Sequence, residues 1–185
     1  MSFKIGLAKK EMSLLFKGVG MMGYGQPHNT VTEAATPLFS RAVVIQDEKN
    51  NYFIFVNLEL AFATIAIKED VTAQLIKKFP DWNLNLNNIL ISAQHTHSAP
   101  GGYSHYPFYN FTITGFRPRI LKAIVDATVD AIVEASQNLF PGEIRLGHHH
   151  VPPDIEVAFN RSMTAYLNNP DVEQIWVKDS HLAVD

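Results

Sequence analysis

Hydrophobic and polar residues follow one another along this chain in a pattern that predicts an α/β fold. Residues 3–8 alternate weakly and predict a short strand, and two further strands are predicted at 41–46 and 52–60. The segment 52–60 is almost continuously apolar, which is typical of a strand covered on both faces of its sheet. A fourth strand is predicted over 88–93 and a fifth over 143–150.

Two segments show the 3.6-residue periodicity of amphipathic helices. The first covers about 66–79 and ends before Pro80, and the second covers about 117–138 with Pro118 in its first turn. From residue 41 onward the order is strand, strand, helix, strand, helix, strand. This order predicts α/β architecture, with a mixed β-sheet flanked by helices. A length of 185 residues suits a single domain over 1–185.

The remaining segments have little periodicity. Residues 18–37 are rich in Gly, Pro, Thr and Asn and predict a long ordered loop, in which the methionines 21–22 favour core packing over an apolar wall for a lipid-like ligand. Residues 151–173 are predicted to be irregular. Short strands are predicted at 175–177 and 181–184.

Composition narrows the functional classes. The chain has 46% hydrophobic and 18% charged residues and a net charge of −3, so nothing favours general binding to nucleic acid or anionic lipid. It contains no cysteine, which excludes disulfides, thiolate metal sites and a cysteine nucleophile. No apolar run is long enough for a transmembrane helix. Charges interrupt the first ten residues too early for a signal peptide, so the chain as written is predicted to be cytoplasmic.

The strongest candidate chemistry directly follows the predicted strand 88–93. The segment reads Gln94-His95-Thr96-His97-Ser98-Ala99-Pro100-Gly101-Gly102. In an extended segment His95 and His97 face one site, with Cα atoms about 6–7 Å apart. One imidazole can then bind zinc while the other serves as a second ligand or a proton carrier. A His-x-His pair also arises by chance among eight histidines. The prediction of a functional site therefore rests on the position of the pair at the end of a strand and on the Pro-Gly-Gly that follows it.

Three other groups are weaker candidates. The run 148–150 consists of three histidines and favours a solvated segment over a metal site. Arg161 can hold a carbonyl or carboxylate oxygen with two donors, although a surface salt bridge explains an isolated arginine better. Glu33 and Glu59 are candidate carboxylate ligands, and Glu59 needs a partner because it ends a buried strand.

Four blocks of sequence together resemble the neutral/alkaline ceramidase family. They occur in the family's order and cover nearly all of this chain, but only the first part of the family's catalytic domain. His-Thr-His-Ser-x-Pro-Gly-Gly is the most specific motif. The blocks are Met21-Met22-Gly23-Tyr24, Ser40-Arg41-Ala42, the segment from Leu90 to Tyr103, and Asn160-Arg161-Ser162 with Ala165-Tyr166-Leu167-Asn168-Asn169-Pro170.

The resemblance implies a zinc-dependent amidohydrolase that cleaves the N-acyl amide of ceramide to sphingosine and a fatty acid. It implies that His95 is a zinc ligand, that His97 is a catalytic residue near the reacting amide, and that Arg161 is a catalytic residue that contacts the substrate. The implied partner is ceramide or a similar N-acyl lipid, with transient contact to a membrane surface and none to nucleic acid. The family is often secreted.

Two kinds of departure from the family pattern change these expectations. Gln94 stands where Thr is common, and Ala99 stands where Gly is common. The family's next zinc histidine, its serine and its later Glu and Tyr ligands fall beyond Asp185, and catalytic zinc normally has three protein ligands. We therefore expect an incomplete catalytic domain that is inactive as this chain.

Two alternatives remain open from the sequence. The chain can be a non-catalytic domain that retains the ceramidase-like fold and binds a lipid or a partner. It can also be a metal-dependent hydrolase with a self-contained site, provided that His95, His97 and the histidines 148–150 meet in space.

Overall fold

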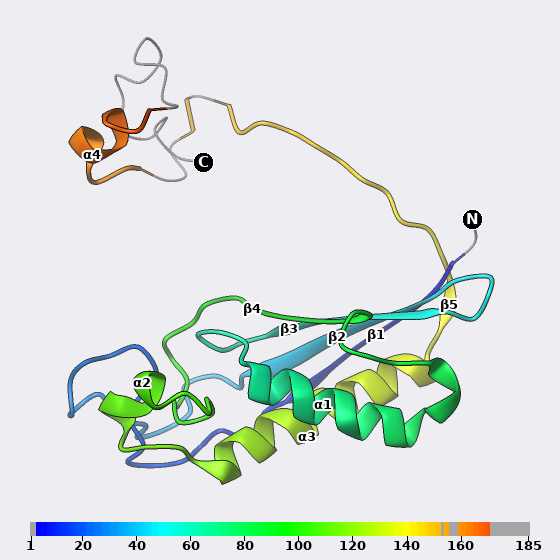
Figure 1. Cartoon of the computed structure of the whole chain (residues 1–185), viewed down its shortest axis with the longest axis horizontal. Coiled ribbons are helices and arrows are strands. Elements are labelled where there is room, and N and C mark those ends of the chain that lie inside the picture. Colours follow the sequence, from blue (N-terminus) through cyan, green and yellow to red (C-terminus); the bar gives the residue numbers. More distant parts are fainter. Residues whose placement is uncertain (1–2, 153, 156–158, 171–185) are drawn as a thin grey trace. The chain divides into compact units, whose positions relative to one another are not determined.

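The computed structural model describes residues 3–152, 154, 155 and 159–170. The chain divides into two compact units, residues 1–144 and 145–185, which are described separately below. A five-stranded sheet forms the centre of the first unit, with strand order β4-β3-β2-β1-β5 (Figure 1). Its strands are β1 (Phe3–Glu11), β2 (Phe39–Gln46), β3 (Tyr52–Leu58), β4 (Ile89–Ala93) and β5 (Phe140–Gly142).

The sheet is mixed, as predicted. Strands β3 and β4 are parallel, whereas the β1–β2, β2–β3 and β1–β5 pairs are antiparallel. The predicted strand 143–150 is wrong, because residues 143–150 form neither helix nor strand. The fifth strand lies just before this segment, where Phe140 pairs with Ile5 and Pro141 with Lys4. Proline lacks a backbone N–H, and an edge strand is the place in a sheet that tolerates it.

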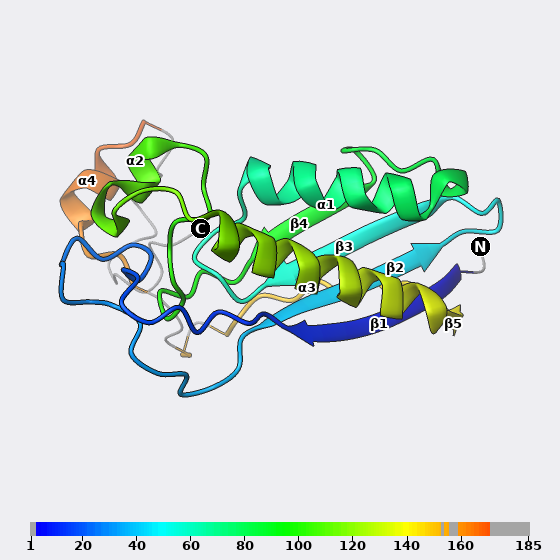
Figure 2. The ribbon, with the colours of Figure 1, turned by 90° about the horizontal axis from the view of Figure 1, so that it is seen from below.

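Two long helices, α1 (Ile65–Lys78) and α3 (Pro118–Gln137), lie within one or two residues of the predicted bounds. Thr64 caps α1 by accepting a hydrogen bond from the backbone N–H of Ile67 at 3.3 Å. Pro118 starts α3 at a position where its missing N–H costs nothing. Figures 1 and 2 show both helices on the same face of the sheet.

The core lies between these helices and the sheet. Period-two alternation directs one set of strand side chains toward the helices, where Val44, Ile54 and Val56 are fully buried beside Ile124 and Ile132 of α3. The burial of one face of α3 confirms the amphipathic helix predicted over about 117–138.

The other face of the sheet carries apolar side chains that the helices do not cover. Leu7, Val43, Phe55 and Leu90 are register partners across β1, β2, β3 and β4, and Leu7 and Leu90 are 55% and 49% exposed. The expected coverage of the segment 52–60 on both faces is therefore not met by the helices of the first unit.

The long loop between β1 and β2 is confirmed. Within it the strand-like contacts are two isolated bridges, Gly20 with Thr30 and Met21 with Pro100. The described residues also contain short helices. In the first unit these are η1 (Pro80–Trp82), α2 (Pro107–Asn110) and η2 (Phe111–Ile113), and in the second unit α4 (Met163–Leu167). Helices α2 and η2 lie between the histidine segment and α3, where the sequence analysis predicts no helix. The predicted strands at 175–177 and 181–184 lie outside the described residues.

Among the described helices, none combines the length and the apolar character that crossing a membrane requires.

Candidate functional site

The histidine segment begins where the parallel strands β3 and β4 end. The backbone N–H of Gln94 donates to the carbonyl oxygen of Leu58 at 3.1 Å, and that of Thr96 donates to Leu60 at 3.0 Å. The hydrogen bonding between the segments that follow β3 and β4 thus continues past the ends of both strands. His95 lies between these two bonds and has a left-handed backbone, with φ of +68°. A non-glycine residue in this region is uncommon and is concentrated at functional sites.

The two motif histidines meet, but by a route that differs from the extended one expected from the sequence. The left-handed conformation at His95 breaks the alternation of side chains. Even so, the Nε2 atoms of His95 and His97 lie 3.3 Å apart, and the ring planes are 84° to each other. The pair therefore presents two imidazole nitrogens to one point.

His97 is oriented by the neighbouring loop. Its Nδ1 lies 2.8 Å from the carbonyl oxygen of Met22. Because a carbonyl oxygen only accepts hydrogen bonds, Nδ1 carries a proton, and in the neutral ring the lone pair is then on Nε2, which faces His95. Gly23 makes this approach possible, since a β-carbon there would lie 2.1 Å from Nδ1 of His97. The ring of Tyr24 completes the surroundings, edge-on at 5.8 Å between centroids.

The other side of the histidine segment is fixed by the same loop. The backbone N–H of Met22 donates to Ala99 at 3.1 Å, and that of Gly101 donates to Gly20 at 3.0 Å. Gly102 then turns the chain with φ of +87°, and a β-carbon there would lie 2.6 Å from Cγ of Arg117. The Pro-Gly-Gly sequence thus serves the sharp turn and close approach expected of it.

The distance between the two nitrogens fits a metal. Two nitrogens at about 2.0–2.1 Å from one zinc, at the tetrahedral angle, lie about 3.3–3.4 Å apart. His95 and His97 have this separation. Within the part of the chain that the structure describes, no third His, Asp or Glu joins them to form a group of three. The described residues therefore supply at most half of a four-coordinate site.

Glu59 has a structural role in place of the ligand role considered from the sequence. It is buried, and its Oε1 accepts from Nε and Nη2 of Arg41 at 2.9 and 2.7 Å. Its Oε2 accepts from the backbone N–H of Phe39 at 2.8 Å. Arg41 is the partner that a buried carboxylate needs, and the pair ties the end of β3 to the start of β2.

Tyr103 follows the histidine segment in the chain and is fully buried, with its ring 5.5 Å from that of Phe62 between centroids. Burial raises the pKa of its hydroxyl to about 12. The backbone N–H groups of Ala61 and Phe62 oppose this shift, although neither has the geometry of a hydrogen bond to the hydroxyl. The sequence gives no sign of this tyrosine beyond its position after Pro-Gly-Gly.

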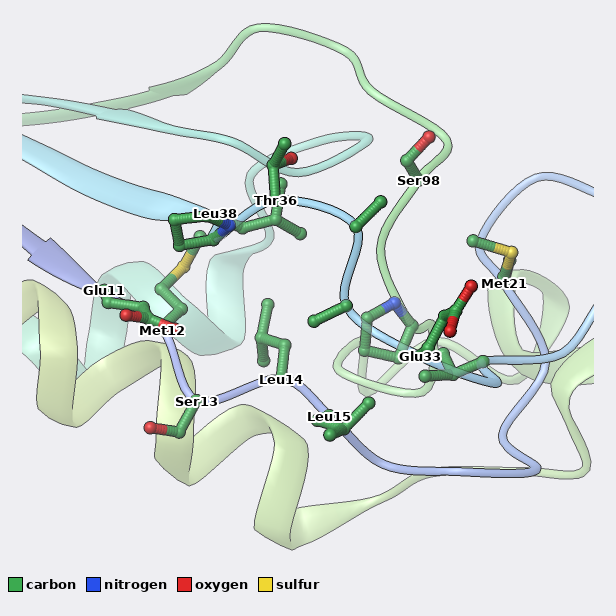
Figure 3. Close-up of a pocket in the computed structure, with 15 residues that line it drawn as sticks. Glu11, Met12, Ser13, Leu14, Leu15, Met21, Glu33, Thr36, Leu38 and Ser98 are labelled. Atoms are coloured by element: carbon green, nitrogen blue, oxygen red, sulfur yellow. The ribbon is translucent and has the colours of Figure 1, made fainter.

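A cavity of about 530 Å³ lies beside the histidine segment (Figure 3). Its walls come from the segment 11–15, the loop 31–38, and the residues Met21, Ser98 and Pro100. Met21 thus lines a cavity, whereas Met22 is buried at 3% exposure and packs in the core, as the sequence favours. Glu33 belongs to this cavity.

Two sequence candidates lie in the second unit. Arg161 is exposed and lies two residues before α4, within a turn in which the backbone N–H of Ser162 donates to Oδ1 of Asn160 at 2.8 Å. The rings of His148 and His150 are 4.8 Å apart between centroids and are also exposed. That either group joins His95 and His97 stays a prediction.

The sequence and the fold match known proteins over almost the whole chain. The model of the family "Neutral/alkaline non-lysosomal ceramidase, N-terminal" matches residues 3–181. The neutral ceramidase of Pseudomonas aeruginosa is 33% identical over 171 residues, which is 92% of this chain and 25% of that protein. Neutral ceramidase 1 of Arabidopsis thaliana is 32% identical over 172 residues, which is 93% of this chain and 22% of that protein.

Solved structures agree with these relatives. A structure titled "Ceramidase complexed with C2" matches with a TM-score of 0.80 and 32% identity, covering 94% of this chain and 26% of that one. A crystal structure of the neutral ceramidase from Pseudomonas aeruginosa matches with the same TM-score and identity, over 94% and 27% of the two chains. This chain therefore spans about a quarter of the length of its curated relatives.

The fold and the histidine segment define an α/β protein that presents paired imidazoles at the carboxyl ends of two parallel strands. The chain belongs to the neutral/alkaline non-lysosomal ceramidase family. The sequence names Met22 and Gly23 in a block that carries the family resemblance, but it does not reveal that they orient His97. A backbone carbonyl leaves no signature in a sequence, and Gly23 in Met-Met-Gly-Tyr-Gly is the only available signal.

Proposed function

We propose that this chain is the N-terminal portion of the catalytic domain of a zinc-dependent amidohydrolase, which cleaves the N-acyl amide of ceramide to sphingosine and a fatty acid. Relatives named neutral ceramidases support ceramide as the substrate, and the family suggests a metal cofactor in general. The observation that carries the proposal is the 3.3 Å separation between the Nε2 atoms of His95 and His97. That separation suits two ligands of one zinc ion.

Each site residue has a role in this proposal. His95 holds the metal, and the left-handed turn directs its ring toward His97. The Nδ1 of His97 donates to the carbonyl oxygen of Met22, so Nε2 of the neutral ring can bind the metal or accept a proton from the attacking oxygen nucleophile. Arg161 is proposed to contact the substrate carbonyl. When bound, zinc supplies the charge that polarises the amide carbonyl and activates an oxygen nucleophile.

The 185 residues alone are proposed to be inactive. Catalytic zinc sites normally use three protein ligands, and the described residues bring two imidazoles together. Two nitrogens are enough for weak metal binding but leave the ion poorly held and poorly oriented.

A transient contact with a membrane surface is part of the same proposal, since the substrate is a lipid. Phe108 of α2 and Phe111 of η2 are 85% and 86% exposed, on the segment that follows the histidines. Exposed aromatic rings of this kind insert at the boundary between lipid headgroups and acyl chains.

A second function is favoured by one observation. The cavity of about 530 Å³ needs no metal to accept an apolar ligand. A non-catalytic lipid-binding domain would bind lipid there without zinc.

The experiment that tests the proposal measures zinc binding and hydrolysis together. Zinc titration of the purified chain by calorimetry is expected to give one weak site, which His95→Ala removes. Hydrolysis of a short-chain fluorescent ceramide is expected to be undetectable with or without zinc. Turnover that His95→Ala abolishes would show a complete site and contradict the proposed inactivity. Zinc binding that survives His95→Ala would contradict the assignment of His95 as a ligand.

A further inference from the structure

The cavity beside the histidine segment has a charge pattern that selects among lipid ligands. Its lining is mostly apolar, but it includes the carboxylates of Glu11 and Glu33. Among the described residues that line it, none is Lys, Arg or His. Neither carboxylate is paired with a cation in the described structure. An apolar cavity with unpaired negative charge attracts a cationic amphiphile and repels an anionic one.

One of the two carboxylates, that of Glu33, lies at the end of the cavity that adjoins the histidines. Figure 3 shows the Glu33 side chain directed toward the Met21 and Ser98 end, with Glu11 and Met12 at the opposite end. Met21 directly precedes Met22, whose carbonyl oxygen holds His97. Ser98 directly follows His97 in the chain. Two residues that line the cavity are therefore next to the histidine site: Ser98 is the neighbour of His97 in the chain, and Met21 is the neighbour of Met22, which contacts His97.

We propose that this cavity binds the long-chain primary amine that amide cleavage releases, with its ammonium group near Glu33 and its hydrocarbon chain against the apolar walls. This inference rests on the proposed function. Hydrolysis of an N-acyl amide breaks the C–N bond, adds the oxygen of water to the acyl carbon, and leaves a carboxylate and an ammonium group at neutral pH. Of these two products only the amine carries the charge that Glu33 attracts.

The size of the cavity agrees with such a ligand. A volume of about 530 Å³ lies within the range of about 300–1,000 Å³ typical of small-molecule sites. Leu14 and Val31 contribute buried apolar wall, and the exposed loop 33–37 leaves one side open for entry. An alkyl chain of about ten carbons can leave water here without burying a polar group.

Calorimetry with matched ten-carbon ligands tests the proposal on the 185-residue chain. The probes are n-decylamine, which is protonated at pH 7, sodium decanoate and the neutral 1-decanol, each below its aggregation concentration. Decylammonium is expected to bind at least about fivefold more tightly than decanoate, as one favourable charge contact near the surface predicts. Decanol is expected to lie between them.

Variants locate the binding. Glu33→Gln is expected to abolish the preference for decylammonium and to leave decanol binding unchanged. Glu69→Gln, which removes the same charge from the exposed surface of α1, is expected to change neither. Ala35→Trp, at an exposed lining position, is expected to weaken all three ligands by filling the cavity. Circular dichroism checks that each variant is folded.

Each result decides between outcomes. Decanoate binding as tightly as decylammonium, a preference that survives Glu33→Gln, or no alkyl binding at all would overturn the proposal. Zinc titration of the wild-type chain separates the two ideas, because the proposed zinc ligands do not include Glu33. Zinc binding with no amine binding would leave the metal proposal intact and remove only this one.

Discussion

Gly23 packs directly against the imidazole ring of His97. A β-carbon at position 23 would lie 2.1 Å from Nδ1 and 2.3 Å from Cε1 of that ring, and the backbone of Gly23 has φ of +89°. Any other residue would displace the ring and strain the backbone at once. The absence of a side chain at Gly23 is thus what lets the Met22 carbonyl orient the ring of His97 through Nδ1.

Gly23→Ala is expected to weaken zinc binding by about 10–100-fold, the usual effect of losing a group that orients a metal-binding histidine. The measurement is a competition titration with a chromophoric chelator. Gly25→Ala is the matched control, because a β-carbon at position 25 meets nothing within 4 Å and its φ is not positive. Equal zinc affinity in Gly23→Ala and the wild type would show that the loop does not orient His97.

The Arg41–Glu59 pair gives a prediction about stability. Glu59 is buried while the side chain of Arg41 is 49% exposed. Breaking the pair therefore costs free energy mainly because it leaves the buried carboxylate of Glu59 without its charged partner. Arg41→Leu is expected to lower the free energy of unfolding by about 1–3 kcal/mol, because it leaves charge-assisted hydrogen bonds unmade. Urea unfolding followed by circular dichroism measures this change.

The exposed pair Lys122–Asp126 on α3 serves as the control for Arg41→Leu. Lys122→Leu removes a cation of similar length and is expected to change stability by at most about 0.5 kcal/mol. A double variant, Arg41→Leu with Glu59→Leu, should recover part of the loss. Independent, additive effects of the two substitutions would argue against a coupled pair.

The sequence predicted most of the fold because the signals were local. Apolar runs located β2, β3 and β4, and the 3.6-residue stripe located α3 to within one residue at each end. The error at 143–150 has a physical cause: the fifth strand was predicted to start after Gly142, whereas pairing with Lys4 and Phe3 makes Pro141 and Gly142 part of an edge strand. That pairing joins residues far apart in the chain, which no local pattern records.

The candidate site was predictable in its residues but not in its geometry. The motif identified His95 and His97, yet the left-handed conformation of His95 depends on the bonds of its neighbours to Leu58 and Leu60. Glu59 looked like a candidate ligand because its partner Arg41 lies 18 positions earlier in the chain. The cavity beside the histidines is likewise assembled from four separate segments of the chain.

The buried hydroxyl of Tyr103 predicts how stability depends on pH. Burial raises its pKa from 10.0 to about 12. Below pH 10 both the folded and the unfolded protein hold this proton, so stability is fully present. Above pH 10 the unfolded protein releases the proton first, and stability falls until the folded protein also ionises near pH 12. The loss amounts to about 2–3 kcal/mol.

Tyr103→Phe is expected to flatten this decline. Urea unfolding at intervals between pH 9 and pH 12 checks it, with Tyr109→Phe as a control because Tyr109 is 49% exposed. The same decline in Tyr103→Phe and in the wild type would assign the alkaline loss to other groups.

Phe108 and Phe111 provide the test of membrane contact. Both rings are almost fully exposed on the segment 107–113, so they cost little to transfer from water to lipid. The double variant Phe108→Ser with Phe111→Ser is expected to weaken binding to neutral phosphatidylcholine vesicles by at least about tenfold, since each buried ring contributes about 1.5–3 kcal/mol. Co-sedimentation with the vesicles measures the bound fraction.

Ile76→Ser on α1 removes an apolar side chain that is 44% exposed, and should leave binding unchanged. Equal loss in both variants would mean that binding follows general surface hydrophobicity, and the assignment of α2 and η2 as the contact would be wrong.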